Sequence, residues 1–346
     1  MPEEELKKAR TAWANTMKSK KKDDADTIIL KKMLRKLKQD DVDQFLTNIY
    51  GLHRKGKPHI SNTSGCSGSE GFMIVGMAFA ELVTNMFKDD TAFRWLSNGS
   101  AEFDAPKQQF IVGPIHQAIR ERGGVTEQDL PCCFSNYAEM SHSKGHCVVH
   151  GPKLQSTGGK APSVTDADRS CRVKSADVHW AGISCKTMSR LFKEWGRLAP
   201  SALREKSGSS GDTFLHLLNY LDAEKPLIYV GENVDDITKP DNLDSLLEEF
   251  GRRGYAMRGM SLKSSDYSSP QKRVRYYFIC INIAKSGLSE QEVFDILKNI
   301  FATIAALTVP MTELADHRLP ESHRYRARAA RARVALAVGA SVLLED

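Results

Sequence analysis

The sequence contains no apolar run long enough to cross a membrane, since a helical span needs about 20 consecutive apolar residues. It has no recognisable secretory leader, and its seven cysteines follow no regular spacing. These absences argue against a membrane protein and against a secreted domain held together by disulfides. We therefore expect reduced thiols and a location inside the cell.

The sequence also has little excess of either charge, because the net charge is only +6 over 346 residues. The excess lies at the two ends. Residues 1–58 contain 15 Lys and Arg against 9 Asp and Glu, and residues 317–346 contain six Arg against three acids. The middle of the chain has no positive excess, so a general attraction to nucleic-acid phosphates is expected from the ends or from a local stripe. With 41% hydrophobic residues, the chain can form one sizeable core with appendages.

Three segments each combine a predicted strand with one or two reactive side chains. They are 177–189, a buried strand running into a turn that presents Cys185; 226–234, an apolar strand that ends with Glu232; and 270–283, in which Arg273 and Arg275 precede a strand at 276–283. Residues just past the carboxyl ends of neighbouring strands converge on one crevice in an α/β sheet. The thiol, the carboxylate and the arginines can therefore share one site.

These segments resemble the motifs of the C5-cytosine methyltransferase family, which has Pro-Cys, Glu-Asn-Val and Gln-x-Arg-x-Arg. Here Ser184-Cys185, Glu232-Asn233-Val234 and 271–275 stand in those places. The intervals of 47 residues from Cys185 to Glu232 and 43 from Glu232 to Arg275 each leave room for one helix and one strand. Ser184 replaces the family's proline, so we expect a less rigid turn.

Two further expectations follow from the resemblance. The segment 207–214 is similar to the family's mobile loop and the helix after it, and is predicted to be flexible before a helix begins. Lys186 is predicted to favour the thiolate of Cys185 through its positive charge.

The glycine-rich segment 61–71 precedes the apolar run 72–83 and resembles the turn that holds S-adenosyl-L-methionine in this family. It is predicted to use positive φ angles at Gly65 and Gly68, and the N–H groups at the start of the next helix could bind the cofactor's carboxylate. A plain loop is the alternative interpretation. The candidate cofactor contacts are Ser64, Gly65, Cys66 and Gly68, with Glu139 at the end of an expected strand 134–140 for the ribose and Asp166, or else Asp168, for the adenine.

The resemblance implies a definite chemistry. Cys185 attacks cytosine C6 to form a covalent adduct, Glu232 hydrogen-bonds or protonates N3, Arg275 contacts O2, and Arg273 helps to hold the site and the nucleic-acid backbone. The target base has to be flipped out of its stack. Each residue also has a structural alternative: a buried cysteine, a solvated acid, and a charged edge strand.

A group of possible metal ligands lies between the cofactor and cysteine motifs. His142, His146, Cys147 and His150, near Cys132 and Cys133, offer nitrogen and sulfur ligands for zinc. Structural zinc sites usually have paired ligands at tighter spacings, so a polar loop is the preferred interpretation and no metal is expected.

The predicted organisation is a basic helical arm at 1–57, a catalytic domain at 58–310 with an insertion at about 85–130, and an Arg/Ala-rich tail at 311–346. In the arm, Leu30, Met33, Leu34 and Leu37 recur at helical spacing, and this face could dock on DNA, on a partner or on the core of its own domain. The lysines of 18–22 are a candidate nuclear-import patch, which gives the nucleus as the expected compartment.

The segment after Arg275 lacks two features that the family usually has, a target-recognition region and a Gly-Asn motif. The resemblance therefore implies a Rossmann-like methyltransferase fold, α/β with a mixed, mostly parallel sheet, that uses S-adenosyl-L-methionine to methylate cytosine C5 in DNA. It also suggests a partner protein that supplies recognition. The alternatives are methylation of cytosine in RNA such as tRNA, and a catalytically inactive scaffold.

Overall fold

The computed structural model describes residues 1–18, 30–31, 34–54, 59–66, 71–87, 93–123, 130–140, 147–150, 171, 173–188, 201–266 and 273–306. Within these residues, no helix combines the length and the apolar character that a membrane span requires. The Arg/Ala-rich segment 311–346 and the lysines of 19–22 lie outside the described residues.

Seven strands form one sheet in the order β3-β2-β1-β4-β5-β7-β6. Their bounds are Cys133–Phe134 for β3, Arg94–Ala101 for β2, His59–Gly65 for β1, Val178–Gly182 for β4, Ile228–Val234 for β5, Val274–Asn282 for β7 and Tyr255–Lys263 for β6. The first five strands are parallel, and β7 runs antiparallel to both β5 and β6. The predicted mixed, mostly parallel α/β sheet is confirmed.

Helices cover both faces of the sheet because alternate strand residues point to opposite sides. Val230 packs in one apolar cluster and its neighbour Tyr229 in the other. The first cluster includes side chains of α1 (Glu3–Lys18), α3 (Gln39–Arg54), α4 (Gly71–Phe87) and α13 (Glu290–Ala306). The second includes α7 (Tyr137–Met140), α9 (Ala202–Glu205), α10 (Gly208–Glu224) and α11 (Pro240–Arg252). Three short elements complete the later part of the chain, η3 (Asp235–Thr238), η4 (Ser264–Asp266) and α12 (Ile283–Ser286).

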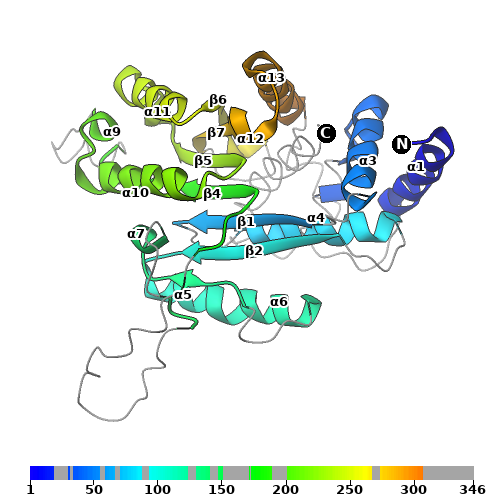
Figure 1. Cartoon of the computed structure of the whole chain (residues 1–346), viewed down its shortest axis with the longest axis horizontal. Helices are drawn as coiled ribbons and strands as arrows, with labels where there is room; N and C mark the ends of the chain where they lie inside the picture. Colours follow the sequence, from blue (N-terminus) through cyan, green and yellow to red (C-terminus); the bar gives the residue numbers. More distant parts are fainter. Residues whose placement is uncertain are drawn as a thin grey trace, which may run out of the picture.

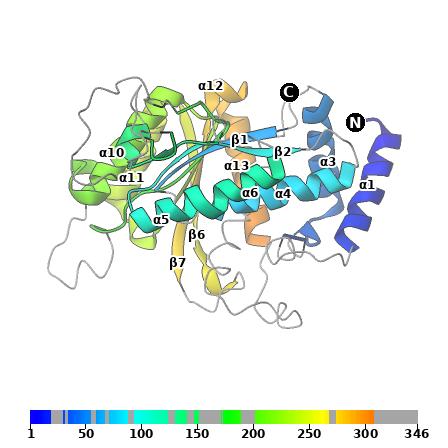
Figure 2. The ribbon, with the colours of Figure 1, turned by 90° about the horizontal axis from the view of Figure 1, so that it is seen from below.

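The two N-terminal helices belong to the core. Trp13 and Met17 of α1 are buried in the first apolar cluster, and the ring of Trp13 lies 5.5 Å from that of Phe45 in α3. Arg10 joins the same two helices through both oxygens of Asp43, at 2.7 and 2.6 Å. Leu30 and Leu34 are buried in the same cluster, and Leu37 packs against it. Of the three alternatives for the face that carries these leucines, the structure therefore shows docking on the protein's own core. In Figures 1 and 2, α1 and α3 lie at the opposite end of the molecule from α10 and α11.

The range 85–130, expected to be an insertion, contains β2 and a long helical segment. That segment is built from α5 (Ala105–Phe110), a π-helical turn at Ile111–Ile115 and α6 (His116–Gly123). β2 pairs with β1 along its whole length, so this range is an integral part of the sheet. β2 carries several polar and small residues and few apolar ones, and for this reason its sequence gives little strand signal.

The strand expected at 134–140 is also wrong. β3 ends at Phe134, and α7 begins three residues later at Tyr137. The side chain of Asn136 accepts a hydrogen bond from the N–H of Glu139 at 3.1 Å, as a residue capping a helix start does. Glu139 therefore lies on a short helix and not at the end of a strand.

A buried polar network fixes the end of β1. Thr63 Oγ1 lies 2.9 Å from His179 Nδ1 and 2.7 Å from the hydroxyl of Tyr220, and the hydroxyl of Tyr137 lies 2.5 Å from His179 Nε2. A neutral imidazole can donate at one nitrogen and accept at the other, so both nitrogens are satisfied without a charge. Burial lowers the pKa of His179 to about 3. The histidine is therefore neutral in the folded protein.

This network predicts a loss of stability in mild acid. The folded-state pKa of His179 is depressed, so the unfolded chain binds the extra proton as the pH falls below its ordinary value of 6.5. We expect the free energy of unfolding to fall by about 2 kcal/mol between neutral pH and about pH 5 from this residue alone. Urea unfolding of the wild type and of His179→Gln at both pH values measures it. The variant should be less stable at neutral pH and lose less on acidification, and an equal loss in both proteins would contradict the prediction.

Candidate active site

The predicted reactive residues come together at one edge of the sheet. The carboxyl ends of β1, β2, β4 and β5 share this edge because these strands are parallel. β7 runs antiparallel to β5, so its first residues lie at the same edge. In Figure 1 the arrowheads of β1 and β2 point toward the side where α7 lies. The edge thus collects residues from four parallel strands and from the start of a fifth.

Cys185 is half-buried in a turn that follows β4. The N–H of Met188 donates to the carbonyl of Cys185 at 3.0 Å, which closes the turn. Asn233, buried in β5, donates from Nδ2 to the carbonyl of Ile183 at 3.0 Å. The Asn of the Glu-Asn-Val motif therefore fastens the cysteine turn to the strand that carries the acid.

The start of α10 supports the cysteine turn from another side. The N–H of Thr187 donates to Ser210 Oγ at 3.2 Å. Gly208 has φ of +62°, and a Cβ at this position would lie 2.9 Å from the methyl carbon of Thr187. Gly211 is equally close-packed, since its Cβ would lie 2.3 Å from the backbone of Lys206. The segment 207–214 was expected to be flexible, but it is helical from Gly208 because its small residues allow close packing.

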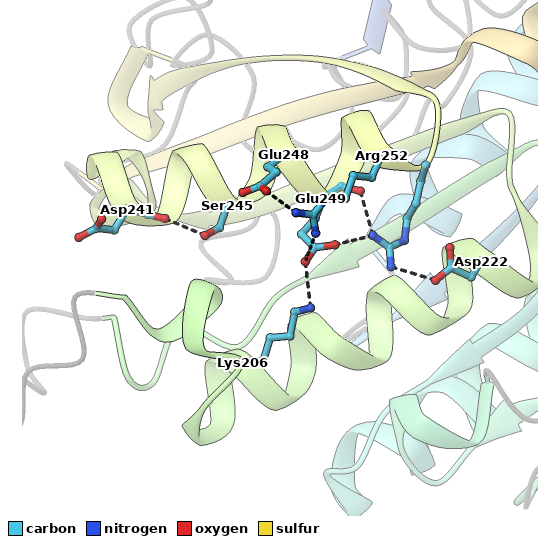
Figure 3. Close-up of polar contacts among 8 residues, drawn as sticks. Lys206, Asp222, Asp241, Ser245, Glu248, Glu249 and Arg252 are labelled. Carbon is cyan, nitrogen blue, oxygen red and sulfur yellow. Dashed lines mark hydrogen bonds and ion pairs between the residues drawn. The ribbon is translucent and has the colours of Figure 1, made fainter.

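A group of ion pairs holds α10 against α11 (Figure 3). Glu249 accepts Lys206 Nζ at 2.9 Å and Arg253 Nη1 at 2.7 Å, and Arg253 also contacts Asp222 at 2.9 Å. Lys206 lies just before α10, and Asp222 lies in its last part. Both ends of the helix behind the cysteine turn are therefore tied to the helix that follows β5.

Glu232 and Arg275 form an ion pair across neighbouring strands, with Arg275 Nε 3.1 Å from Glu232 Oε1. Glu232 is paired with Gly182 of β4, where a Cβ would lie 3.7 Å from Glu232 Oε2. The carboxylate therefore lies beside Gly182 at the end of β4, at ordinary contact distance. The pKa of Arg275 is lowered because burial and the Arg273 charge outweigh its attraction to Glu232 and Cys185. Arg275 is therefore within electrostatic reach of both Glu232 and Cys185.

Arg273 lies just outside β7 with an exposed side chain. Its N–H donates to Ser264 Oγ at 3.0 Å, and its carbonyl accepts the N–H of Ser264 at 2.9 Å. The backbone at the open end of the β6–β7 pair is fixed by these two bonds. Gln271 and Lys272 of the same motif lie outside the described residues.

The ammonium group of Lys186 lies 5.3 Å from the centroid of the Phe103 ring. This cation–π contact engages the charge that was predicted to favour the Cys185 thiolate. Phe103 is 67% exposed and follows β2, so the contact joins the cysteine turn to the end of a strand two positions away in the sheet. Sequence reasoning missed Phe103 because the range 85–130 was taken for an insertion.

The predicted cofactor turn begins at the end of β1. Ser64 is buried, and Gly65 packs so closely on Tyr137 that a Cβ would lie 2.5 Å from its ring. Cys66 has φ of +51°, a left-handed angle that is uncommon for a residue other than glycine. The positive φ expected at Gly65 therefore falls at Cys66, and Gly65 is needed for close packing. Gly68 and Asp166 lie outside the described residues.

Glu102 is a candidate cofactor contact that the sequence interpretation missed. It follows β2 directly, is buried, and accepts the N–H of Asp104 on Oε1 at 3.0 Å. Burial, together with the charge of Glu102, raises the pKa of Cys66 to about 12. Glu102 therefore faces the turn after β1. It occupies the strand-end position for which Glu139 was proposed, and recognition of β2 as a strand would have identified it.

Comparison with known proteins connects this edge with one family. Residues 160–331 match the model of the C-5 cytosine-specific DNA methylases. The Type II methyltransferase M.NgoFVII of Neisseria gonorrhoeae is 22% identical over 155 residues, which cover 43% of this chain and 36% of that protein. The chain thus spans about a third of this curated relative.

Two solved structures are similar at low level. S. pombe Dnmt2 methyltransferase is 13% identical, with a TM-score of 0.35, over 69% of this chain and 54% of that protein. Entamoeba histolytica methyltransferase EhMeth is 10% identical, with a TM-score of 0.37, over 64% of this chain and 53% of that protein. The family match includes Cys185, Glu232, Arg273 and Arg275. Residues 160–331, which contain the cysteine turn and the Glu232–Arg275 ion pair, are therefore similar to the C-5 cytosine-specific DNA methylases.

Proposed function

We propose that this protein transfers a methyl group from S-adenosyl-L-methionine to C5 of cytosine in DNA, through a covalent adduct with Cys185. The observation that carries the proposal is the ion pair of Glu232 and Arg275 at the strand edge that presents the Cys185 turn. A thiol, a carboxylate and a guanidinium converge there from three separate strands. The family match covers all three residues.

Each residue has a role that follows from its chemistry. The Cys185 thiolate would add to C6, and the electron pair that this addition displaces toward N3 would be stabilised by a proton that the Glu232 carboxyl group, in its protonated form, donates to that nitrogen. Arg275 holds the Glu232 carboxyl group in place and offers further N–H donors to the cytosine O2. When C5 takes the methyl group, S-adenosyl-L-homocysteine would be the leaving group; water would then take the C5 proton as the Cys185 thiolate leaves C6, which restores the C5–C6 double bond. Arg273, exposed at the same edge, is placed to meet a phosphate.

The described residues fit S-adenosyl-L-methionine, which supplies an electrophilic methyl group when bound. Glu102 offers a buried carboxylate, suited to the paired hydroxyls of a ribose, at the end of the strand next to β1. Cys66 turns the backbone sharply after β1, and α4 begins at Gly71, so the free N–H groups of a helix start follow the turn. The exposed ring of Phe103 adds a stacking surface beside Glu102.

Recognition of a particular sequence is expected to be weak. After Arg275 the described residues form β7, α12 and α13, and these elements contribute to the sheet and its cover. The two N-terminal helices lie at the opposite end of the molecule from α10 and α11 (Figures 1 and 2). We propose that a partner protein supplies the missing recognition, and that binding by this chain alone is mainly to phosphates and falls with added salt.

Covalent trapping tests the proposal. The purified protein is incubated with S-adenosyl-L-methionine and 5-fluorocytosine-containing oligonucleotides, as matched DNA duplexes of varied sequence and as tRNA, and adducts are resolved on a denaturing gel. We expect an adduct with DNA, with little difference among sequences. An adduct formed only with tRNA would replace DNA by RNA as the substrate. The absence of both cofactor binding and an adduct on either nucleic acid would favour the inactive, cofactor-free scaffold.

A further inference from the structure

Four side chains of types that can bind metals converge beside β3, the outermost strand on one side of the sheet. They are Cys132, Cys147, His150 and Cys171, and their three sulfur atoms and one ring nitrogen all lie within 4.8 Å of one another. Cys132 directly precedes β3, and Cys171 precedes β4 in the chain. None of the four belongs to the group around Cys185.

The three sulfur–nitrogen distances within this cluster match those of a tetrahedral zinc site. His150 Nδ1 lies 3.5 Å from Cys132 Sγ, 3.5 Å from Cys147 Sγ and 3.6 Å from Cys171 Sγ. A zinc ion with bonds of about 2.3 Å to sulfur and about 2.0 Å to nitrogen, at tetrahedral angles, separates the sulfur and nitrogen atoms by about 3.5 Å. The three cysteines are free thiols.

Hydrogen bonding alone does not account for this arrangement. A neutral imidazole nitrogen accepts one hydrogen bond, and thiols are weak donors, so His150 Nδ1 cannot satisfy three thiols together. Cys147 is fully buried, and Cys132 and Cys171 are half-buried. A cation bound at the centre would contact all four atoms and would stabilise the thiolate forms, which are the metal ligands.

The backbone holds the ligands in these positions. The backbone of Cys147 forms an isolated antiparallel β-bridge with that of Phe134 in β3, and the N–H of Val148 donates to the carbonyl of Cys133 at 2.8 Å. The carbonyl of Cys132 accepts the N–H of Ser100 in β2 at 2.8 Å.

We propose that Cys132, Cys147, His150 and Cys171 bind one zinc ion as a structural site. Three sulfurs and one imidazole in tetrahedral arrangement suit zinc. All four ligands would be protein side chains, which is typical of a structural and not a catalytic zinc. The ion would tie together three separate segments, the residue before β3, the turn 147–150 and Cys171 ahead of β4.

The sequence suggested a different set of ligands. His142 and His146 lie outside the described residues, and Cys133 is buried in β3 and is not in the cluster. Neighbouring residues of a strand point to opposite faces, which explains why Cys132 and not Cys133 joins it. Cys171 is 21 residues from His150. This separation hides the fourth ligand from a search for closely paired spacings.

Metal analysis of the purified full-length chain tests the site. After expression with zinc and removal of loosely bound metal, we expect about one zinc per chain in the wild type and in the control Cys133→Ala, whose cysteine adjoins a ligand without being one. Cys171→Ser and His150→Ala should each lose most of the zinc. Equal zinc in Cys171→Ser and Cys133→Ala would overturn the assignment, as would a wild type without zinc.

A second measurement does not depend on whether the ligand variants fold. Cobalt(II) is added to wild-type protein from which the metal has been removed, and the absorption spectrum is recorded. We expect thiolate-to-cobalt charge-transfer bands and the intense visible bands of tetrahedral cobalt, both displaced by one equivalent of zinc. A spectrum without thiolate bands, or a disulfide among these cysteines in the freshly purified protein, would contradict the zinc site.

Discussion

Cys185→Ala is expected to abolish methyl transfer and covalent trapping on 5-fluorocytosine, down to the background of the assay. The reason is that the adduct forms through the thiol itself, and alanine has no nucleophile. Affinity for S-adenosyl-L-methionine should be unchanged, because Cys185 follows β4 whereas the proposed cofactor contacts follow β1 and β2. Radiolabelled methyl transfer, gel trapping and calorimetry on the same preparation measure the three quantities.

Cys280→Ala is the matched control for this experiment. Cys280 is a fully buried cysteine in β7, and its loss should leave both activities close to wild type. Methyl transfer that persists in Cys185→Ala would exclude the covalent mechanism. Loss of cofactor binding together with activity would instead show that the turn at 184–188 contributes to the cofactor site.

Glu102→Gln is expected to weaken S-adenosyl-L-methionine binding by about 10- to 100-fold, since a hydrogen bond to a charged group contributes about 1.5–3 kcal/mol. Glutamine preserves the size of the side chain and removes the charge. Glu139→Gln is the control, because Glu139 lies on α7 and not at a strand end. Calorimetric titration compares the two variants. A larger loss for Glu139→Gln than for Glu102→Gln would return the ribose contact to the residue that the sequence first suggested.

The half of the site after β4 could be predicted from sequence, and the half before it only in part. Cys185, Glu232 and Arg275 were recognisable because each lies beside an apolar run that forms a strand of the sheet. β2 has no such run, so Glu102 and Phe103 at its end could not be placed. The Asn136 side chain also caps a short helix, by accepting the N–H of Glu139, where the sequence suggested a strand.

Other features of the site depend on packing between segments that are distant in sequence, which no short motif contains. The small residues of 207–214 suggest flexibility when read alone, but Gly208 and Gly211 are positions where another residue's atoms leave no room for a Cβ. The ion pairs of Lys206 with Glu249 and of Arg253 with Asp222 likewise join segments that are distant in sequence. The convergence of Cys132, Cys147, His150 and Cys171 depends on β3 being an edge strand, which the sequence did not indicate.

The hydrogen bond from Asn233 to the carbonyl of Ile183 has a consequence for protein engineering. Because Glu232 and Asn233 are adjacent in β5, the strand that carries the proposed acid also anchors the turn of the proposed nucleophile. A cysteine loop transplanted alone into another α/β scaffold would lose the anchor that sets its distance from the carboxylate. The smallest portable unit is therefore β4, its turn and β5 together, with the register of Gly182 opposite Glu232 preserved.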